Sequence, residues 1–268
     1  MAAERATRRL QNLQGTPDYD VADFKPRFSR WCLFVFAIDE GERIRAQIRA
    51  LQDYTGLVDV VIADGGSTDG SLVEGELSIA GLRALLTKRG AGRLSAQMRM
   101  AFHWAISEKY DGVIVMDGNG KDDPAAIRDF VHALESGFDH IQGSRYITGG
   151  RGVNTPPMRH LGVTLLHAPL ISIAARRRHT DTTNGFRAYS MRLLADPRVK
   201  PLRNVFVSYE LHYYLAIRAS ELGLRMTELP VTRTYPSGTP TPTKIRGMRG
   251  NFEILRTLLR AAWHRYDP

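Results

Sequence analysis

Two polar loops contain the residues whose types and spacing could do chemistry. The first (ADGGSTDGS) follows an apolar run and contains Asp64 and Asp69. A carboxylate at a strand end suits nucleoside recognition, because Asp64 could accept hydrogen bonds from a base or a ribose. Asp69 is typical of a residue that opens a helix, as its cap or as a first-turn acid. A plain strand-to-helix turn would explain this loop equally well.

The second polar loop (MDGNGKDDP) places Asp117 and Asn119 two residues apart after another apolar run. Two oxygen donors at this spacing can share a hard cation, Mg²⁺ or Mn²⁺, that also holds a diphosphate. The alternative interpretation is a turn in which Asp122 or Asp123 caps a helix that starts at Pro124.

A basic, glycine-rich segment, Lys88–Arg93 (KRGAGR), lies between these loops in the sequence. Glycine lets a backbone approach a phosphate closely, and the cations favour anions. The chain lacks the GxxxxGK[ST] pattern of a P-loop, and no GxGxxG follows its first predicted strand. The segment therefore indicates an anion contact of another kind.

Apolar periodicity predicts the elements that must position these loops. Four apolar runs are typical of buried strands, and helical spacing occurs between them over Ile44–Leu51 and Leu94–Ala105. This alternation predicts an α/β fold with a parallel sheet and right-handed crossovers. Ligands bind beyond the carboxyl ends of such strands, so both polar loops should face one crevice. The strands are expected over 31–38, 58–63, 82–87 and 112–116.

The second half of the chain is less regular after Gly143. It predicts helices near 159–176 and 205–222, a strand over 224–232, and a basic amphipathic helix from Asn251 to His264. The segment Pro236–Pro242 (PSGTPTP) is typical of a loop.

Composition limits the class of protein. The chain has 268 residues, of which 43% are apolar, so we expect one large domain with a sizeable core. A net charge of +9 attracts polyanions: nucleic acid, phosphorylated substrates or an anionic membrane. Cys32 is the single cysteine, which excludes a disulfide framework within one chain and predicts a buried apolar role.

The ends of the chain and its longest uncharged stretch bear on location. Residues 1–29 are polar and arginine-rich, and we expect a flexible lead-in there. Leu161–Ala175 is shorter than the roughly 18 residues of a spanning helix, and Pro169 interrupts it. We therefore expect a cytoplasmic protein, able to lie on the cytoplasmic face of a membrane without crossing it.

Six motifs occur in a fixed order from Phe34 to about Lys244. They are FAIDE at 36–40, IADGGSTDG at 62–70, DGN at 117–119, GSRY at 143–146, DTTNGFR at 181–187, and ELPV at 228–231 with the basic loop behind it. In this order they resemble the family-2 inverting glycosyltransferases. The resemblance is strongest to the polyprenyl-phosphate, dolichol-phosphate-mannose synthase-like branch.

The resemblance implies a GT-A fold, a Rossmann-like nucleotide-sugar-binding fold with a mostly parallel central sheet flanked by helices. It implies a catalytic domain over 30–244, leaving 245–268 as a C-terminal basic amphipathic helix. It also implies inverting transfer of a sugar from a UDP- or GDP-sugar with the help of Mg²⁺ or Mn²⁺. The chain departs from the family in two motifs that hold aspartates, where Gly65 and Asn119 each replace one, and its first motif lacks the family's proline and tyrosine, so the contact with the base could differ there. Asparagine offers an oxygen without a charge, and Lys121 could take over part of the cation's work.

By the same resemblance, the donor site and its metal are assigned to the first half of the chain. Asp117 and Asn119 would hold the cation, and Arg89 is a further candidate near the donor. The donor nucleotide-binding residues would be Asp39, Glu40, Asp64, Gly92, Arg93, Asp117 and Gly118.

The acceptor would be bound by the second half. Arg145, Arg159 and Arg187 are candidates to hold an acceptor phosphate, because guanidinium matches phosphate geometry. Asp181 and Arg145 are the catalytic candidates. Asp181 would be the base for a hydroxyl acceptor, or would hold the turn that follows it. Arg233 and Lys244 would form a lid on the diphosphate, or a solvated basic loop.

The expected partners are the nucleotide sugar and a polyprenyl phosphate or other lipid-linked acceptor. The membrane contact would be made by Leu161–Ala175 and the terminal helix, although both could be ordinary core-packing helices. A glycosyltransferase with a soluble hydroxyl acceptor is the first alternative. A non-catalytic nucleic-acid binder lacks a zinc, recognition-helix or RNA motif here. A nucleotidyltransferase would carry a glycine-rich, lysine-bearing signature where this chain has FAIDEGERI.

Overall fold

The computed structural model describes residues 7–11, 15–237 and 247–268. The chain forms two compact units. The first comprises residues 1–120 and 201–208, and the second comprises residues 121–200 and 209–268. The predicted lid residue Lys244 lies outside the described residues, as does most of the loop predicted over 236–242.

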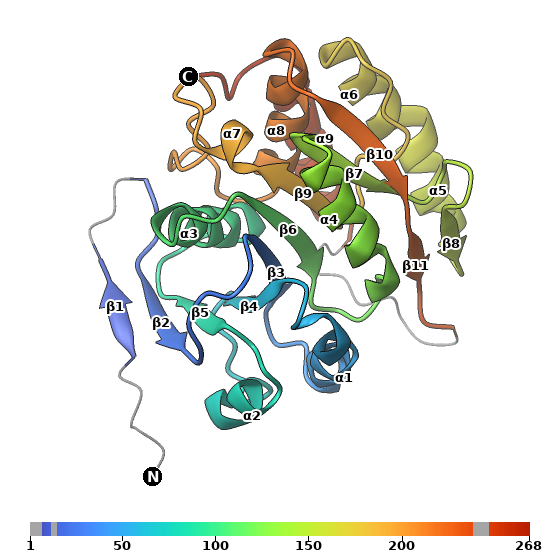
Figure 1. Cartoon of the computed structure of the whole chain (residues 1–268). Helices are drawn as coiled ribbons and strands as arrows, with labels where there is room; N and C mark the ends of the chain where they lie inside the picture. The colour runs from blue at the N-terminus through green and yellow to red at the C-terminus, as the bar shows by residue number, and fades with distance from the viewer. Residues whose placement is uncertain (1–6, 12–14, 238–246) are drawn as a thin grey trace. The chain divides into compact units, whose positions relative to one another are not determined.

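The first unit is built on a sheet with the strand order β1-β2-β5-β4-β3-β6 (Figure 1). Strands β3 to β6 run parallel, whereas β2 is antiparallel to β5 and β1. Every residue of β3 and β4 is buried, which explains why their sequences are continuous apolar runs. The predicted parallel strands are therefore confirmed. The strands are β1 (Arg8–Leu10), β2 (Tyr19–Asp23), β3 (Trp31–Ala37), β4 (Asp59–Asp64), β5 (Ala84–Lys88) and β6 (Gly112–Asp117).

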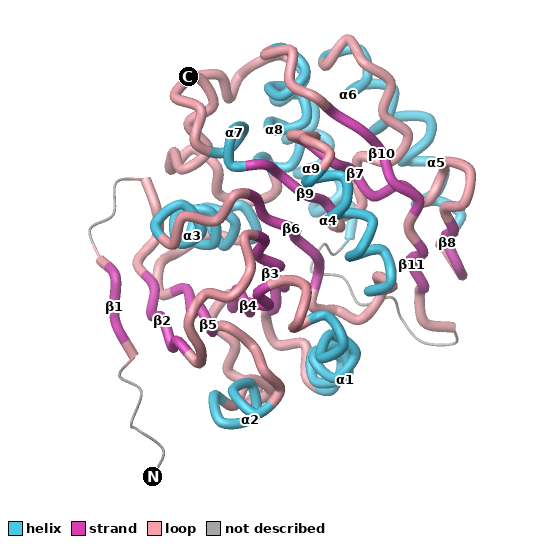
Figure 2. The backbone as a smooth tube through the Cα atoms, viewed as in Figure 1, coloured by secondary structure: helices cyan, strands magenta, loops and turns pink. Residues whose placement is uncertain are grey.

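Helices cover both faces of this sheet. The crossovers from β3 to β4 and from β5 to β6 run in opposite directions, so right-handed connections place α1 and α3 on opposite faces. Figure 2 shows α1 and α2 on one side of the strands and α3 on the other. Trp104 of α3 meets Phe34 of β3 edge to face, with ring centroids 6.0 Å apart. The helices are α1 (Glu42–Leu51), a 3-10 turn η1 (Gln52–Tyr54), α2 (Glu74–Ile79) and α3 (Leu94–Ser107).

The segment predicted to be a flexible lead-in, 1–29, includes part of this sheet. Tyr19 and Val21 of β2 are fully buried, and Tyr19 Oη lies 2.9 Å from His103 Nδ1. The alternating sequence YDVAD of β2 buries one set of side chains against the unit. The lead-in prediction is therefore wrong for residues 19–23. Cys32 is buried in β3, as predicted.

The second unit contains the strand order β9-β7-β10, with β10 parallel and β9 antiparallel to β7. A separate pair, β8 and β11, is parallel. The strands are β7 (His140–Ser144), β8 (Arg151–Val153), β9 (Arg187–Ser190), β10 (Met226–Pro230) and β11 (Thr232–Thr234). The helices are η2 (Pro124–Ala126), α4 (Ile127–Glu135), α5 (Pro157–Gly162), the π-helical turn η3 (Val163–His167), α6 (Ala168–Ala174), α7 (Met191–Leu194), α8 (Glu210–Glu221) and α9 (Gly247–Ala262).

Several boundaries in the second unit follow from local chemistry. Asp123 caps η2 by accepting a hydrogen bond from the Ala125 N–H at 2.9 Å, which confirms one of the two predicted caps. The helix predicted near 205–222 begins only at Glu210. Over the described ranges, no helix is both long and apolar enough to span a bilayer. The predicted domain limits, 30–244 and 245–268, stay predictions.

Candidate functional site

The loops that follow three parallel strands of the first unit open at one edge of its sheet. Ala37 of β3 pairs with Asp64 of β4, and Phe36 of β3 pairs with Asp117 of β6. Because these strands are parallel, Asp39, Asp64 and Asp117 all lie at carboxyl ends of strands. The predicted placement of the two polar loops on one edge is confirmed.

A relay of hydrogen bonds braces the Asp64 loop against the residues after β3. The Asp39 N–H donates to Ser67 Oγ at 2.9 Å, and this hydroxyl donates to Asp64 Oδ1 at 2.6 Å. In the other direction, Asp39 Oδ1 accepts from the Thr68 N–H at 2.8 Å. These bonds hold Asp39 at a left-handed φ of 46°. Burial raises the pKa of Asp64, and the hydrogen bonds from Ser67 oppose this shift.

Asp69 does not open a helix, so that prediction is wrong. Its Oδ1 accepts from the N–H and the hydroxyl of Ser71, at 3.0 and 2.6 Å, and its Oδ2 accepts from the Gly41 N–H at 2.8 Å. Helix α2 begins later, at Glu74. Asp69 instead connects this loop to Gly41, the residue immediately before α1.

Gln47 of α1 fixes the loop that contains Asp117. Its Nε2 donates to the Asp117 carbonyl oxygen at 2.9 Å, and its Oε1 accepts from the Gly120 N–H at 3.0 Å. Gln47 is buried between the apolar residues Ile44 and Ile48. Sequence reasoning did not assign it a role; a glutamine within an apolar helix stripe is the signal that could have found it.

The side chains of Asp117 and Asn119 fit a hard divalent cation. Asn119 Nδ2 lies 3.4 Å from Asp117 Oδ2, and a turn of the amide would exchange this nitrogen for the amide oxygen. One carboxylate oxygen and one amide oxygen are ligands that Mg²⁺ and Mn²⁺ accept. Gly118 packs so closely that an added Cβ would lie 2.9 Å from the Phe36 carbonyl oxygen. The loop therefore needs glycine at this position.

The basic segment after β5 is only partly directed towards this edge. Lys88 is buried and donates to the Gly90 carbonyl oxygen at 2.5 Å. Burial lowers the pKa of Lys88, and the charge of Asp64 opposes this shift. Arg89 pairs with Asp20 of β2 at 2.7 Å, which does not support its predicted place beside the donor.

Three other residues predicted to bind the donor, Gly92, Arg93 and Glu40, have structural contacts within the protein. Gly92 has a φ of 102°, and an added Cβ would lie 2.6 Å from the Ala96 Cβ. The Arg93 N–H donates to the Val207 carbonyl oxygen at 2.7 Å. Glu40 forms a 2.8 Å ion pair with Arg43. Their contacts with a donor stay predictions.

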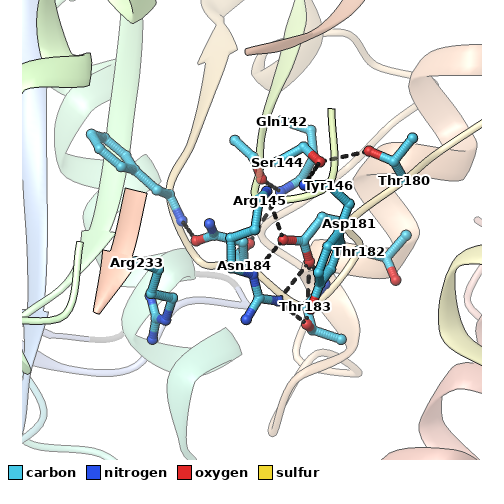
Figure 3. A network of polar contacts seen from close by, with 12 residues as sticks. Gln142, Ser144, Arg145, Tyr146, Thr180, Asp181, Thr182, Thr183, Asn184 and Arg233 are labelled. Atoms are coloured by element: carbon cyan, nitrogen blue, oxygen red, sulfur yellow. Dashed lines mark hydrogen bonds and ion pairs between the residues drawn. The ribbon is translucent and has the colours of Figure 1, made fainter. Parts of the chain in front are cut away.

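In the second unit, Arg145 and Asp181 form a buried, two-pronged ion pair (Figure 3). Arg145 Nε lies 2.7 Å from Asp181 Oδ2, and Nη2 lies 2.9 Å from Oδ1. The same guanidinium donates to the hydroxyls of Thr183 at 2.9 Å and Tyr235 at 2.7 Å. The two side chains of the pair are 1% and 0% exposed.

This geometry contradicts the predicted role of Asp181 as a general base. Burial would raise the pKa of Asp181, but the hydrogen bond and the charge of Arg145 lower it. A carboxylate that is buried and held in an ion pair is a weak proton acceptor at neutral pH. The alternative role, holding the turn, agrees with the hydrogen bonds at 3.3 Å from Thr183 to Asp181 Oδ1.

Arg187 does not have the position predicted for a phosphate ligand. Its guanidinium donates to the carbonyl oxygens of Asn184 (2.9 Å), His212 (2.9 Å) and Thr182 (2.6 Å). The residue is 2% exposed. Since all three nitrogens bind backbone oxygens, Arg187 organises the DTTNGFR turn, and we withdraw it as an acceptor ligand.

Arg233, the described member of the predicted lid, is an anchored side chain. Its Nη1 lies 2.5 Å from Asp122 Oδ2, and the two residues also form an antiparallel bridge. Both side chains are buried.

Arg159 on α5 is half-buried, and its guanidinium carbon lies 5.8 Å from the ring centre of Tyr235. Of the three arginines predicted to bind the acceptor phosphate, Arg159 therefore has the position that best agrees with that role.

Two curated proteins are similar to this chain over most of their length. The undecaprenyl-phosphate mannosyltransferase of Micrococcus luteus is 26% identical over 199 residues, covering 72% of this chain and 79% of the relative. The polyprenol monophosphomannose synthase of Mycolicibacterium smegmatis is 24% identical over 218 residues, covering 80% and 81%.

A solved structure shares the fold. Glucosyl-3-phosphoglycerate synthase from Mycobacterium tuberculosis, in complex with Mn²⁺, uridine diphosphate and glucosyl-3-phosphoglycerate, aligns with a TM-score of 0.63 at 17% identity. The alignment covers 91% of this chain and 86% of that one. The predicted GT-A fold is confirmed. The model of the family described as "Glycosyl transferase family 2" matches residues 32–196, more than half of the chain. The chain therefore belongs to glycosyl transferase family 2.

Proposed function

We propose that this glycosyltransferase moves a sugar, with inversion, from a nucleoside diphosphate sugar to a polyprenyl phosphate. We choose a phosphate as the acceptor because of the ion pair that Asp181 forms. The base that a hydroxyl acceptor would require is held in a buried pair with Arg145. A phosphate acceptor is already anionic and needs positioning rather than a base. The names of the two curated relatives support the same acceptor class.

The donor would bind at the strand edge of the first unit. Asp64 would accept hydrogen bonds from the nucleoside, and the relay through Ser67 would hold its carboxylate in place before the donor arrives. Gln47 would hold the Asp117 loop in the same way. A divalent cation between Asp117 and Asn119 would offset the negative charge that develops on the leaving diphosphate.

The reaction would be a single displacement. An oxygen of the acceptor phosphate attacks the anomeric carbon of the sugar from the face opposite the diphosphate. The bond from this carbon to the diphosphate breaks, and the nucleoside diphosphate leaves with the bonding electrons. Inversion follows from this one-step geometry, and no protein carboxylate has to take a proton.

The test is a transfer assay with labelled UDP- and GDP-sugars and two acceptors, farnesyl phosphate and farnesol. We expect transfer to the phosphate only, lost with EDTA and restored by Mg²⁺ or Mn²⁺. Asp117→Ala should lower the rate at least about 100-fold. Asp111→Ala is the control, because Asp111 precedes the other end of β6 and pairs with Arg30 on the surface. Equal rates for both variants would contradict the donor-site proposal, and transfer to farnesol would contradict the phosphate acceptor.

We also propose that the second unit lies on an anionic membrane through α5, η3 and α6. Large apolar side chains on this stretch are exposed, and no acidic residue occurs between Arg151 and Thr180. Arg176, Arg177 and Arg178 lie just beyond the end of α6, after Ala175, which suits anionic headgroups. The exposed apolar residues are Met158, Leu161, Leu165, Leu166 and Ile173.

Helix α9 is less suited to this role. Leu258 and Ala261 are buried and the helix packs on α6 and α8, although Phe252 is exposed. In a sedimentation assay with phosphatidylglycerol vesicles, Ile173→Ser should weaken binding, because it removes an apolar side chain that is 75% exposed. Ile79→Ser on α2, where the side chain is 88% exposed, should not. Equal effects, or no binding by the parent protein, would contradict this surface.

A further inference from the structure

Four cationic side chains of the second unit surround the buried ring of Tyr235. Arg145 Nη1 donates to the phenol oxygen at 2.7 Å. The charged groups of Lys121, Arg159 and Arg233 lie 5.7, 5.8 and 5.9 Å from the ring centre. Each distance is within the range in which a cation is attracted to an aromatic face. Tyr235 is 2% exposed, so the ring is a fixed part of this arrangement.

Backbone pairing brings these residues together from distant parts of the chain. Tyr235 follows β11, and its N–H donates to the Val153 carbonyl oxygen of β8 at 2.9 Å. The Thr234 N–H donates to the Lys121 carbonyl oxygen at 2.8 Å, which sets Lys121 beside the end of β11. Arg159 is on α5, shortly after β8. The backbone of Tyr235 is therefore held by β8, independently of the cations.

The four cations differ in their partners. Arg145 forms an ion pair with Asp181, and Arg233 forms one with Asp122. Lys121 is buried, at 8% exposure, and Arg159 is half-buried. A phosphate monoester carries about −1.5 to −2 at neutral pH. Four cationic side chains gathered beside one ring suit an anion of this kind.

We propose that Tyr235 is a positioning residue that aims Lys121 and Arg159 at the phosphate of the acceptor. Its ring holds the two cations in place, and its hydroxyl fixes the Arg145 guanidinium behind them. This inference rests on the phosphate acceptor proposed above and adds Tyr235 and Lys121 to that site. Tyr235 itself does not touch the substrate.

Two substitutions separate the ring from the hydroxyl. Tyr235→Phe keeps the aromatic face and loses the hydrogen bond from Arg145. Tyr235→Leu loses both. We expect KM for farnesyl phosphate to rise about threefold in Tyr235→Phe and at least about tenfold in Tyr235→Leu. The thermal stabilisation by the donor nucleotide should stay at the parent value in both variants.

Tyr189→Leu is the matched control for loss of a buried tyrosine. Tyr189 is fully buried on β9, and its hydroxyl lies 3.0 Å from His212 Nδ1. This control should lose stability without a change in the acceptor KM. If Tyr235→Leu does not fold, Lys121→Met provides the test, and its acceptor KM should rise about tenfold.

The outcomes separate this inference from the proposed function. No donor stabilisation and no transfer by the parent protein would overturn the proposed function itself. Transfer by the parent enzyme with an unchanged acceptor KM in Tyr235→Leu, or in Lys121→Met where that variant is the test, would overturn the role of Tyr235 alone. A rise in KM for Tyr189→Leu as large as that for Tyr235→Leu would also overturn it, because the effect would then reflect stability. The expected pattern is a larger rise in KM for Tyr235→Leu than for Tyr235→Phe.

Discussion

Asp181→Asn tests whether the pair with Arg145 is a structural element of the second unit. The substitution keeps the shape of the side chain and removes its charge. Arg145 then stays buried, at 1% side-chain exposure, without its carboxylate. Removing one partner of a buried ion pair costs about 3–5 kcal/mol. For a chain of this size, each kcal/mol lowers the melting temperature by about 2–4 °C. We therefore expect a drop of about 6–20 °C.

The assay is thermal unfolding followed by circular dichroism, without ligands, at neutral pH. Asp111→Asn is the control, since Asp111 pairs with Arg30 at a similar distance of 2.6 Å and its side chain is 43% exposed. Exposed ion pairs contribute little, so its melting temperature should stay at the parent value. A drop in the control as large as that in Asp181→Asn would refute the reasoning from burial.

A double-mutant cycle with Arg145→Met makes the test stricter. Arg145→Met alone leaves the Asp181 carboxylate buried and should also destabilise the protein. The double variant removes both charges, so its loss should be smaller than the sum of the single losses by at least about 1 kcal/mol. Additive losses would mean that the two side chains do not depend on each other.

Three further predictions concern pH, packing and the donor loop. Burial, aided by Arg187 and Arg177, lowers the pKa of His179 to about 4, so the unfolded chain binds the extra proton below pH 6.5. Stability should fall between pH 6.5 and 4, with about 3 kcal/mol of the fall due to His179, and His179→Gln should remove that part. Gly118→Ala should cost about 1–3 kcal/mol in urea unfolding, whereas Gly75→Ala, with no atom within 4 Å of the added Cβ, should not destabilise. Ser67→Ala should raise the donor Kd about tenfold in calorimetry, whereas Ser71→Ala, which loses a similar 2.6 Å bond to Asp69, should not. A stability that does not change between pH 6.5 and 4 would contradict the first prediction. Equal losses of stability in the two glycine variants would contradict the second, and equal donor Kd values in the two serine variants would contradict the third.

The fold of the first unit could be predicted because its signal is local. Strands β3, β4 and β6 are buried on both faces, and such runs stand out from any amphipathic pattern. Strand β2 was missed because its five residues pair antiparallel with β5. Neither its length nor its composition distinguishes it from a loop.

The partners of charged residues could not be predicted from spacing. Arg145 and Asp181 were each assigned to chemistry, although they neutralise each other across 36 positions of sequence. Gln47 and Asp117 are 70 positions apart. A sequence shows which residues can form ion pairs and hydrogen bonds, but tertiary contacts decide which pairs form. The same limit applies to Tyr235, whose proposed role rests on contacts with residues far away in the sequence.

The buried pairs divide the predicted acceptor residues into two groups with different functions. Arg145, Arg187 and Arg233 are buried and bound to carboxylates or backbone oxygens, so they give the site its shape. Arg159 is half-buried and lies beside Tyr235, so it is the arginine best placed to meet a ligand. The buried ion pairs fix the shape of this site, and the side chains that remain to bind a ligand are cations rather than a base. Such a site favours an acceptor that is already ionised when it binds. That division is the structural reason to prefer a phosphate over a hydroxyl as the group that receives the sugar.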